Sequence, residues 1–418
     1  MASTQTTREQ TVPFIGPDGS GHAPPGSFPR MRLLIEGWRF LPHSYSIVNQ
    51  WQCLELLRRP NVELMHRDVP VFKQLGERVM GILPPEDEDR IAAIPPPSGE
   101  FDAVYRIGYP YDFAPSRCPN TFVFATCERM LLKPIDVLSP PEIDGRMARA
   151  FAQRIRDNGL TVITPSEWSR SGLVRSGIDP DRIVVVPHGI EPSVFRPLDP
   201  AKREEMRRDR NQTGTFSFLH VSAMTGNKNL EGIVRGFLEI ASRHKHARLI
   251  LKGLDGMFRS DRWVSQELGS LGPAERALAK RTIFYSGLPL TLRDQVALYQ
   301  LSDAYIAPYQ SEGFNIPVLE AAACGLPVIT TKGGPTDEFT TPEFCLPIKA
   351  RFGDHFHDGF QWFDADQNSV VEQMERAITD DSWRSGAAVS GPRHAHANYS
   401  WSAVVDRLLS VIGSRVLT

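Results

Sequence analysis

Two glutamates separated by seven residues have the chemistry to bind a polar ligand. Glu312 lies in the predicted loop 310–314, and Glu320 lies early in a predicted helix, within the stretch YIAPYQSEGFNIPVLEAAACGLPVITT. A carboxylate accepts two hydrogen bonds at once, and charge-assisted bonds are strong, so such a pair suits the hydroxyls of a sugar. Taken in isolation, the two are more simply a solvated loop charge and an acid that stabilises the helix dipole.

The helix that follows Glu312 is predicted to point its N-terminus at a ligand. Asn315 is a favourable N-cap, Pro317 fits the first turn, and Gly325 closes the helix after Cys324. The free N–H groups and the positive end of the helix dipole make such a terminus a site for a diphosphate. The stretch therefore indicates an anion site beside a pair of carboxylates.

The elements that would carry these residues are short β-branched runs that alternate with amphipathic stretches. One series runs from MRLLIE at residue 31 to RIVVVPHG, and a second runs from FSFLHVS to a helix over 370–378. This alternation predicts parallel strands with crossover helices, and hence two doubly wound α/β domains. Ligands bind such sheets at the carboxyl ends of the strands, so we expect the site in the cleft between the domains.

The domain boundaries follow from changes in composition. Residues 1–30 are rich in Gly, Pro and Ser and lack the apolar core of a signal peptide, so we expect a flexible leader. An N-terminal domain is predicted over 31–198 and a C-terminal domain over 213–395. The proline-containing and charged stretch 199–212 is interpreted as the connection between them.

The composition excludes several classes of protein. The 418 residues carry a formal net charge of −2, which provides no overall basic field for nucleic acid. No apolar run approaches the ~20 residues that span a bilayer. The five cysteines form no C-x-x-C pair, which fits a reducing compartment. We therefore expect a cytoplasmic protein that does not bind nucleic acid.

Three weaker signals have a structural and a functional interpretation. The pair His355-x-His357 matches no stable zinc spacing, so we expect a solvated loop and no bound metal. The arginine-rich stretch RMARAFAQRIRD, 146–157, is expected to be a helix packed by its apolar stripe; peripheral contact with the inner face of a membrane is the alternative. His188 is expected to hydrogen-bond its own turn, with contact to the cleft as the alternative.

Read in order along the chain, these motifs resemble the family 4 retaining glycosyltransferases, or group 1 glycosyltransferases, which have the GT-B fold. Glu312-x7-Glu320 in SEGFNIPVLEAAACGLPVI is similar to the family's signature. VVVPHGIEPSVFRP resembles the end of its N-terminal domain, MTGNKNLEGIVRGF its phosphate-binding lysine loop, and YSWSAVVDRLLSVI its final helix. The resemblance covers nearly the whole chain. It implies two Rossmann-like domains facing a cleft, with a helix within 396–418 that returns to the first domain.

The same resemblance implies a role for each candidate residue. Glu320 would hold the ribose of a nucleotide-diphosphate sugar, Glu312 would hold the transferring sugar, and Lys228 would neutralise the leaving diphosphate. Other residues expected near the sugar, the phosphates or the base are Gly313, Phe314, Asn315, Gly287, Leu288 and Gly253.

The reaction that the resemblance implies is transfer of a sugar from a UDP- or GDP-sugar to a saccharide or lipid-linked acceptor, with retention at the anomeric carbon. Such transfer serves the biosynthesis of polysaccharides, glycolipids or other glycoconjugates. The departing phosphate would take the acceptor's proton, so no side-chain nucleophile, cofactor or metal is expected. The alternatives are another enzyme on this fold, an epimerase or a phosphorylase, and a non-catalytic subunit that binds a nucleotide sugar.

The chain departs from the family pattern in the C-terminal domain at two places. Ala223 or Met224 stands where the family commonly has an arginine before Lys228, so one cation for the leaving group is missing or comes from elsewhere. Asn315 stands where the signature usually has a glycine, which adds a side chain beside the donor sugar.

The N-terminal domain departs from the pattern as well. The glycine-rich loop after the first strand is replaced by EGWRFLPHSYSIVNQWQ, in which Ser44 or Ser46 either caps the next helix or contacts phosphate. Cys127 and Glu128 stand where many members have a histidine. Glu128 either accepts a sugar hydroxyl, as a catalytic-site residue, or is a surface charge.

Overall fold

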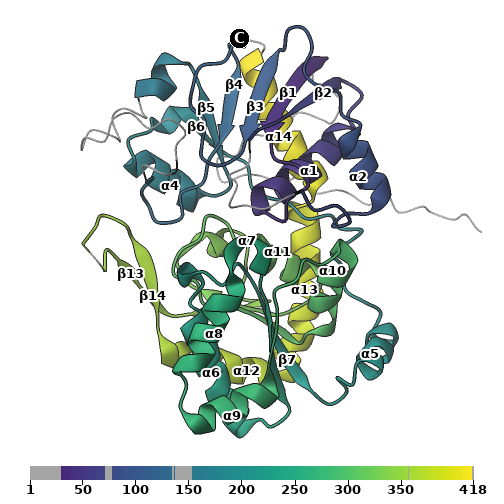
Figure 1. Cartoon of the computed structure of the whole chain (residues 1–418), viewed down its shortest axis with the longest axis vertical. Coiled ribbons are helices and arrows are strands. Elements are labelled where there is room, and N and C mark those ends of the chain that lie inside the picture. Colours follow the sequence, from purple (N-terminus) through teal and green to yellow (C-terminus); the bar gives the residue numbers. More distant parts are fainter. Residues whose placement is uncertain (1–29, 71–77, 134–135, 137–152, 356, 417–418) are drawn as a thin grey trace, which may run out of the picture.

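The computed structural model describes residues 30–70, 78–133, 136, 153–355 and 357–416. Two α/β domains face each other, and the last two helices pass from the C-terminal domain into the N-terminal one (Figure 1). Residues 1–29 of the predicted leader and most of the arginine-rich stretch 146–157 lie outside the described residues.

The N-terminal domain is a six-stranded sheet in the order β2-β1-β3-β4-β5-β6, and all its pairs are parallel. Its strands are β1 Met31–Gly37, β2 Val62–Asp68, β3 Ala103–Ile107, β4 Thr121–Phe124, β5 Thr161–Thr164 and β6 Ile183–Val185. Its helices in the described residues include α1 Ser44–Leu56, α2 Pro85–Ala92 and α4 Glu167–Arg175. The helix expected after the first strand is α1, which begins at Ser44.

The C-terminal domain has a second parallel six-stranded sheet in the order β12-β11-β10-β7-β8-β9. Its strands are β7 Phe216–Val221, β8 Ala247–Lys252, β9 Ile283–Ser286, β10 Ala304–Ala307, β11 Val328–Thr331 and β12 Cys345–Ile348. Its helices are α5 Pro200–Asp209, α6 Leu230–Arg243, α7 Asp255–Phe258, α8 Ser260–Ser270, α9 Pro273–Thr282, α10 Leu292–Leu301, α11 Ile316–Ala323, α12 Gln367–Thr379 and α13 Asp381–Asn398. The final helix, α14 Trp401–Val416, packs on α1 of the first domain.

The two doubly wound sheets confirm the predicted fold class. In α6 the apolar residues at helical spacing, from Leu230 to Ala241, are all buried, because this face covers the second sheet. One feature was not predicted: an antiparallel hairpin, β13 Ala350–Gly353 with β14 Trp362–Ala365, projects from the domain.

A helix occupies most of the predicted connection 199–212. Asp199 caps α5 by accepting a hydrogen bond from the Ala201 N–H at 3.0 Å. Arg207 on this helix is buried and pairs with Asp303 at 2.9 Å, which binds α5 to the C-terminal domain.

The chain crosses between the domains twice, and the two crossings are hydrogen-bonded to each other. The Ile190 N–H donates to the Tyr399 carbonyl at 2.8 Å, and the Trp401 N–H donates to the Ile190 carbonyl at 2.9 Å. Gly189 allows this approach, because a Cβ there would lie 2.9 Å from the Trp401 ring and 3.0 Å from its Cα. The outgoing and returning segments therefore form one joint.

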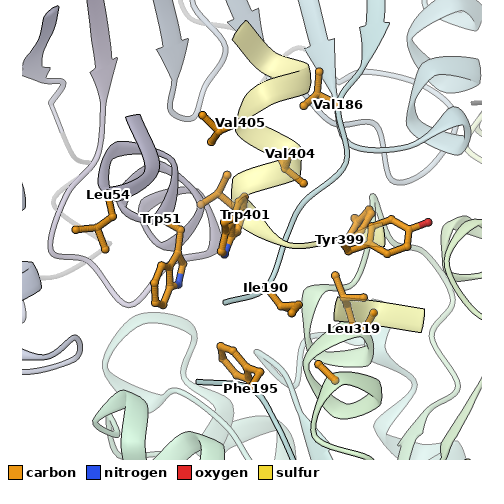
Figure 2. Close-up of a cluster of buried hydrophobic side chains, with 14 of the residues drawn as sticks. Trp51, Leu54, Val186, Ile190, Phe195, Leu319, Tyr399, Trp401, Val404 and Val405 are labelled. Atoms are coloured by element: carbon orange, nitrogen blue, oxygen red, sulfur yellow. The ribbon is translucent and has the colours of Figure 1, made fainter. Parts of the chain in front are cut away.

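Buried side chains from both domains surround this joint (Figure 2). Trp51 of α1 and Val405 of α14 contribute from the N-terminal side, Phe195 and Leu319 contribute from the C-terminal side, and Trp401 lies between them. A single hydrophobic cluster thus extends across the domain boundary, which favours one relative position of the two sheets.

We expect Trp401→Ala to destabilise the protein strongly. Trp401 is 2% exposed, and truncating a buried tryptophan to alanine typically costs about 3–5 kcal/mol. Urea denaturation followed by circular dichroism measures the loss. Trp263→Ala is the matched control, because that side chain is 41% exposed and should lose little. Equal losses in the two variants would contradict a central role for the joint.

Candidate functional site

A cavity of about 570 Å³ lies between the two domains. Its walls include the segments that come after three strands. These are residues 126–129 after β4, 222–223 after β7 and 253–254 after β8. The carboxyl ends of parallel strands therefore open onto the cavity, which is where doubly wound sheets bind ligands.

An ion pair lies in the wall of this cavity. The Lys228 Nζ is 2.6 Å from the Glu312 Oε1, and the two side chains are only 14% and 10% exposed. Lys228 ends a short 3₁₀ turn, Gly226–Lys228, just before α6. Burial acts against its charge, but the carboxylates of Glu312 and Glu128 outweigh this effect and raise the pKa of Lys228. The lysine is therefore held as a cation.

Glu312 experiences the opposite balance. Burial raises the pKa of Glu312, and the ammonium of Lys228 opposes that rise. The carboxylate of Glu312 lies in the loop between β10 and α11, and the pair brings together residues that are 84 positions apart. Two of the three residues predicted for catalysis are thus in direct contact.

Glu128 approaches the same pair from the N-terminal domain. Its Oε2 accepts a hydrogen bond from the Asn227 Nδ2 at 3.3 Å, and the Asn227 amide also donates to the Ser311 carbonyl at 3.0 Å. Glu128 is an exposed side chain that lines the cavity, and its role as an acceptor for a sugar hydroxyl stays a prediction. Asn227, which links the two domains here, was missed by the sequence analysis.

Glu320 lies deeper in the cavity wall, on α11. Its Oε2 accepts hydrogen bonds from the Tyr299 hydroxyl at 2.7 Å and from the Gln295 amide at 3.4 Å, both on α10. Burial raises the pKa of Glu320 to about 7, and the two hydrogen bonds oppose that rise. Near neutral pH this carboxyl therefore exists in both protonation states.

The loop before α11 lines the cavity with Gly313, Phe314 and Asn315. Asn315 occupies the N-cap position, as predicted, but its side chain makes no capping hydrogen bond. Its φ of 77° is left-handed, a conformation that asparagine tolerates better than most residues apart from glycine. Pro317 is in the first turn, and Gly325 follows the helix with a φ of 79°, as expected.

The N-terminus of α4 docks on this loop across the domain boundary. The Ser166 hydroxyl donates to the Gly313 carbonyl at 2.6 Å. The carboxylate of Glu338, in the C-terminal domain, accepts from the N–H groups of Glu167 and Trp168 at 2.8 Å each. A carboxylate at a helix N-terminus is stabilised by the free N–H groups and the dipole, so this contact holds the domains together beside the cavity.

Three of the predicted donor contacts, Ser46, Gly287 and Leu288, do not line the cavity. Ser46 is fully buried and accepts a hydrogen bond from the Leu41 N–H at 3.1 Å, away from the cavity lining. The prediction that Ser44 or Ser46 caps α1 is wrong, because the His43 ring caps it by accepting from the Tyr45 N–H at 3.1 Å. His43 was available as a cap because its Nδ1 reaches the N–H two residues on.

The glycines near β8 and β9 are required for packing. A Cβ on Gly253 would lie 2.6 Å from Ser260, and one on Gly287 would lie 2.0 Å from Asp255. Gly253 lines the cavity, whereas Gly287 and the exposed Leu288 do not; Pro289 and Leu290 line it instead. The proposed contacts of Gly287 and Leu288 with a base stay predictions.

His188 lies in the cavity wall, 5% exposed. Its ring packs against Phe124, Phe314 and Trp401. We expected a hydrogen bond from His188 to its own turn, but within the described part of the chain it forms none. Burial lowers the pKa of His188 to about 3, so the imidazole is neutral.

Metal and membrane features can be checked over the described residues only. There, no group of three or more His, Cys, Asp or Glu side chains is arranged to hold a metal ion. None of the described helices has the length and apolarity to cross a membrane. All five cysteines are buried and free.

Comparison with known proteins places this geometry in context. Residues 202–384 match the family described as Glycosyl transferases group 1. The D-inositol 3-phosphate glycosyltransferase of Corynebacterium diphtheriae is 28% identical over 284 residues, which cover 64% of this chain and 59% of that protein. The O-antigen chain mannosyltransferase B of Escherichia coli is 27% identical over 248 residues, covering 59% and 58%. The matches thus span less than two thirds of these relatives.

Solved structures are similar over almost the full length. Anabaena HepE in complex with UDP-glucose has a TM-score of 0.63 at 14% identity, covering 92% of this chain and 100% of that one. A glycosyltransferase from Rickettsia africae has a TM-score of 0.65 at 14% identity, covering 93% and 99%. The chain therefore has the GT-B fold, and its residues 202–384 match the group 1 glycosyltransferase family.

Proposed function

We propose that this protein is a glycosyltransferase that moves a sugar from a nucleoside-diphosphate sugar to an acceptor hydroxyl. The observation that carries the proposal is the ion pair of Lys228 and Glu312 in the interdomain cavity. Without a donor, these two buried charges satisfy each other. A diphosphate sugar offers both a better partner, because its phosphate attracts the ammonium and its hydroxyls donate to the carboxylate.

The chemical contribution of the site is electrostatic. As the bond between the anomeric carbon and the phosphate oxygen breaks, negative charge grows on the leaving diphosphate. Lys228 and the N–H groups at the start of α11 are fixed in place before the reaction, so they stabilise this charge without reorganising. The contacts of Ser166 and Glu338 hold the two domains together beside the cavity, and closing a site around its substrate expels water.

We infer retention at the anomeric carbon. The acceptor oxygen would bond to that carbon on the face from which the phosphate leaves, and the acceptor proton would pass to the leaving phosphate oxygen. This route requires no nucleophilic side chain and no divalent metal. Glu312 lies next to Lys228, so its carboxylate is placed to accept hydroxyls of the sugar whose phosphate binds Lys228.

The substrates are proposed from the neighbours and from the cavity wall. The Anabaena protein was solved with UDP-glucose, which favours a UDP-sugar donor, with a GDP-sugar as the other candidate. The curated relatives are named for inositol phosphate and O-antigen chains, so a saccharide or lipid-linked acceptor is proposed. Tyr45, Tyr109 and Tyr111 line the N-terminal side of the cavity and suit a sugar ring. Glycoconjugate biosynthesis in the cytoplasm, including at the inner membrane face, fits such substrates.

A screen of UDP-, GDP-, ADP- and TDP-sugars by thermal shift tests the function. A ligand that binds the folded state raises its stability by RT ln(1 + [L]/Kd), so the donor should raise the melting temperature most. We expect the shift to persist in EDTA, because Lys228 and the helix terminus replace a cation. Release of the free nucleoside diphosphate on adding acceptors then distinguishes a transferase from a non-catalytic binding subunit. No shift with any of the four would contradict the proposal.

The raised pKa of Glu320 predicts a pH-dependent effect of Glu320→Gln. In the unfolded chain the carboxyl has its ordinary pKa of 4.5, and in the folded protein the pKa is about 7. The folded state therefore binds the proton more tightly, and stability falls as the pH rises through this window, by up to about 3 kcal/mol above pH 7. Glutamine still accepts from Tyr299 and Gln295 but carries no charge, so the variant should gain stability over the wild type.

The gain should be larger at pH 8 than at pH 5, as measured by urea denaturation at both values. Glu204→Gln, an exposed change on α5, should show no such difference. If Glu320 also holds the ribose, Glu320→Gln should weaken nucleoside diphosphate binding roughly tenfold to a hundredfold. A pH-independent difference in stability would contradict the burial argument, and an unchanged Kd would contradict the ribose assignment.

Lys228→Ala tests whether the lysine acts on the leaving group. An interaction that strengthens in the transition state lowers kcat when it is removed, whereas uniform binding appears mainly in KM. We expect kcat to fall ~100-fold or more, with a much smaller rise in the donor KM. Lys228→Arg should recover only part of the loss, because a planar fork does not reproduce a compact ammonium. A near-normal kcat with a raised donor KM would reduce Lys228 to a docking contact.

A further inference from the structure

Lys252 is a second buried lysine in the wall of the interdomain cavity. It is the last residue of β8 and is only 7% exposed. Its ammonium donates a hydrogen bond to the carbonyl of the next residue, Gly253. Among the described residues, no carboxylate lies within ion-pair distance of it. A buried ammonium without an anionic partner is unfavourable, because its lost hydration is not replaced by an opposite charge.

The other long cationic side chains that line the cavity each have a partner. Lys228 pairs with Glu312. Arg129 lies over the Trp362 ring at 5.1 Å, and the Lys133 ammonium lies 4.9 Å from the centre of the Phe360 ring. Within the described part of the chain, Lys252 differs from them in having neither a carboxylate nor an aromatic ring.

The nearest acid is already engaged elsewhere. Asp255 is close enough to favour the charged form of Lys252, but burial dominates and lowers the pKa of Lys252 to about 8. The Asp255 Oδ1 accepts hydrogen bonds from the Tyr285 hydroxyl and from the Asp261 N–H, the latter at 2.8 Å. Asp255 therefore links α7 to β9, and within the described residues it forms no ion pair with the ammonium of Lys252.

The sheet places Lys252 beside the segment that leads to Lys228. β7 and β8 are adjacent and parallel, and Val221 is paired with Lys252. The Ser222 N–H donates to the Lys252 carbonyl at 3.0 Å, and the chain continues through Ser222 and Ala223, which also line the cavity, to the turn that carries Lys228. The two lysines thus reach one cavity from the carboxyl ends of neighbouring strands.

We propose that Lys252 is a second cationic contact for the diphosphate of the donor, an inference that rests on the proposed function. A diphosphate carries at least two negative charges, so the single ammonium of Lys228 does not neutralise it. Lys252 supplies a fixed positive group on the adjacent strand, and binding of the anion removes the energetic penalty of burying it. The residue contributes to recognition of the phosphates and not of the nucleoside.

Isothermal titration of the full chain with UDP or GDP, whichever the wild type binds, tests this assignment. Lys252→Met keeps the length of the side chain and removes its charge. We expect it to weaken nucleoside diphosphate binding roughly tenfold to a hundredfold, with binding of the corresponding nucleoside changed less than twofold. Lys280→Met, an exposed change on α9, should leave both affinities unchanged.

The test separates the two proposals. The melting temperature of Lys252→Met should be no lower than that of the wild type, because methionine is buried more easily than an unpaired ammonium. Equal weakening of the nucleoside and the diphosphate would mean a structural role and would overturn the assignment. Unchanged diphosphate affinity in Lys252→Met, together with weakened affinity in Lys228→Met, would overturn it and leave the proposed function intact. A wild type that binds neither nucleoside diphosphate would count against both.

Discussion

The hydrogen-bonded joint between Ile190 and the segment Tyr399–Trp401 is the contact on which the rest of the structure depends. Each domain buries its own sheet, but the cavity exists only where the two sheets face each other. A chain that crossed once would leave the domains joined by a single flexible segment. Here the returning segment pairs with the outgoing one, and α14 packs on α1, so a continuous core extends through the boundary (Figure 2).

The contacts beside the cavity differ in kind from that core. They include polar contacts, between Ser166 and the Gly313 carbonyl, between Glu338 and the start of α4, and between Glu128 and Asn227, as well as ring contacts such as Arg129 over Trp362. Polar contacts at a partly solvated boundary contribute modestly, because water competes for the same groups. The packed joint and these contacts together hold the two domains around the cavity.

The charged groups in the cavity wall form a set that burial perturbs. Lys228 and Glu312 compensate each other's charge. Burial raises the pKa of Glu320 to about 7, and Lys252 forms no ion pair with a carboxylate among the described residues. Perturbed groups of this kind collect at functional sites, since the same burial that makes a bare charge unfavourable strengthens its interaction with an incoming partner. A donor with phosphates at one end and hydroxyls at the other would satisfy the whole set.

The sequence by itself determined the parallel α/β class, the alternation of strands and helices along the chain, and the start and end of α11. These depend on local periodicity and on residues such as Pro317 and Gly325, whose backbone preferences act within one or two turns. It also identified Lys228, Glu312, Glu320 and Glu128 as candidates, through motif resemblance.

Only the tertiary structure decided the rest. It assigned the α1 cap to His43, placed Ser46 inside the domain, and brought Asn227, His188 and Lys252 to the cavity. These outcomes depend on contacts between residues far apart in the chain. The sequence around a lysine at the end of a strand is the same whether its ammonium contacts solvent, a carboxylate or a cavity.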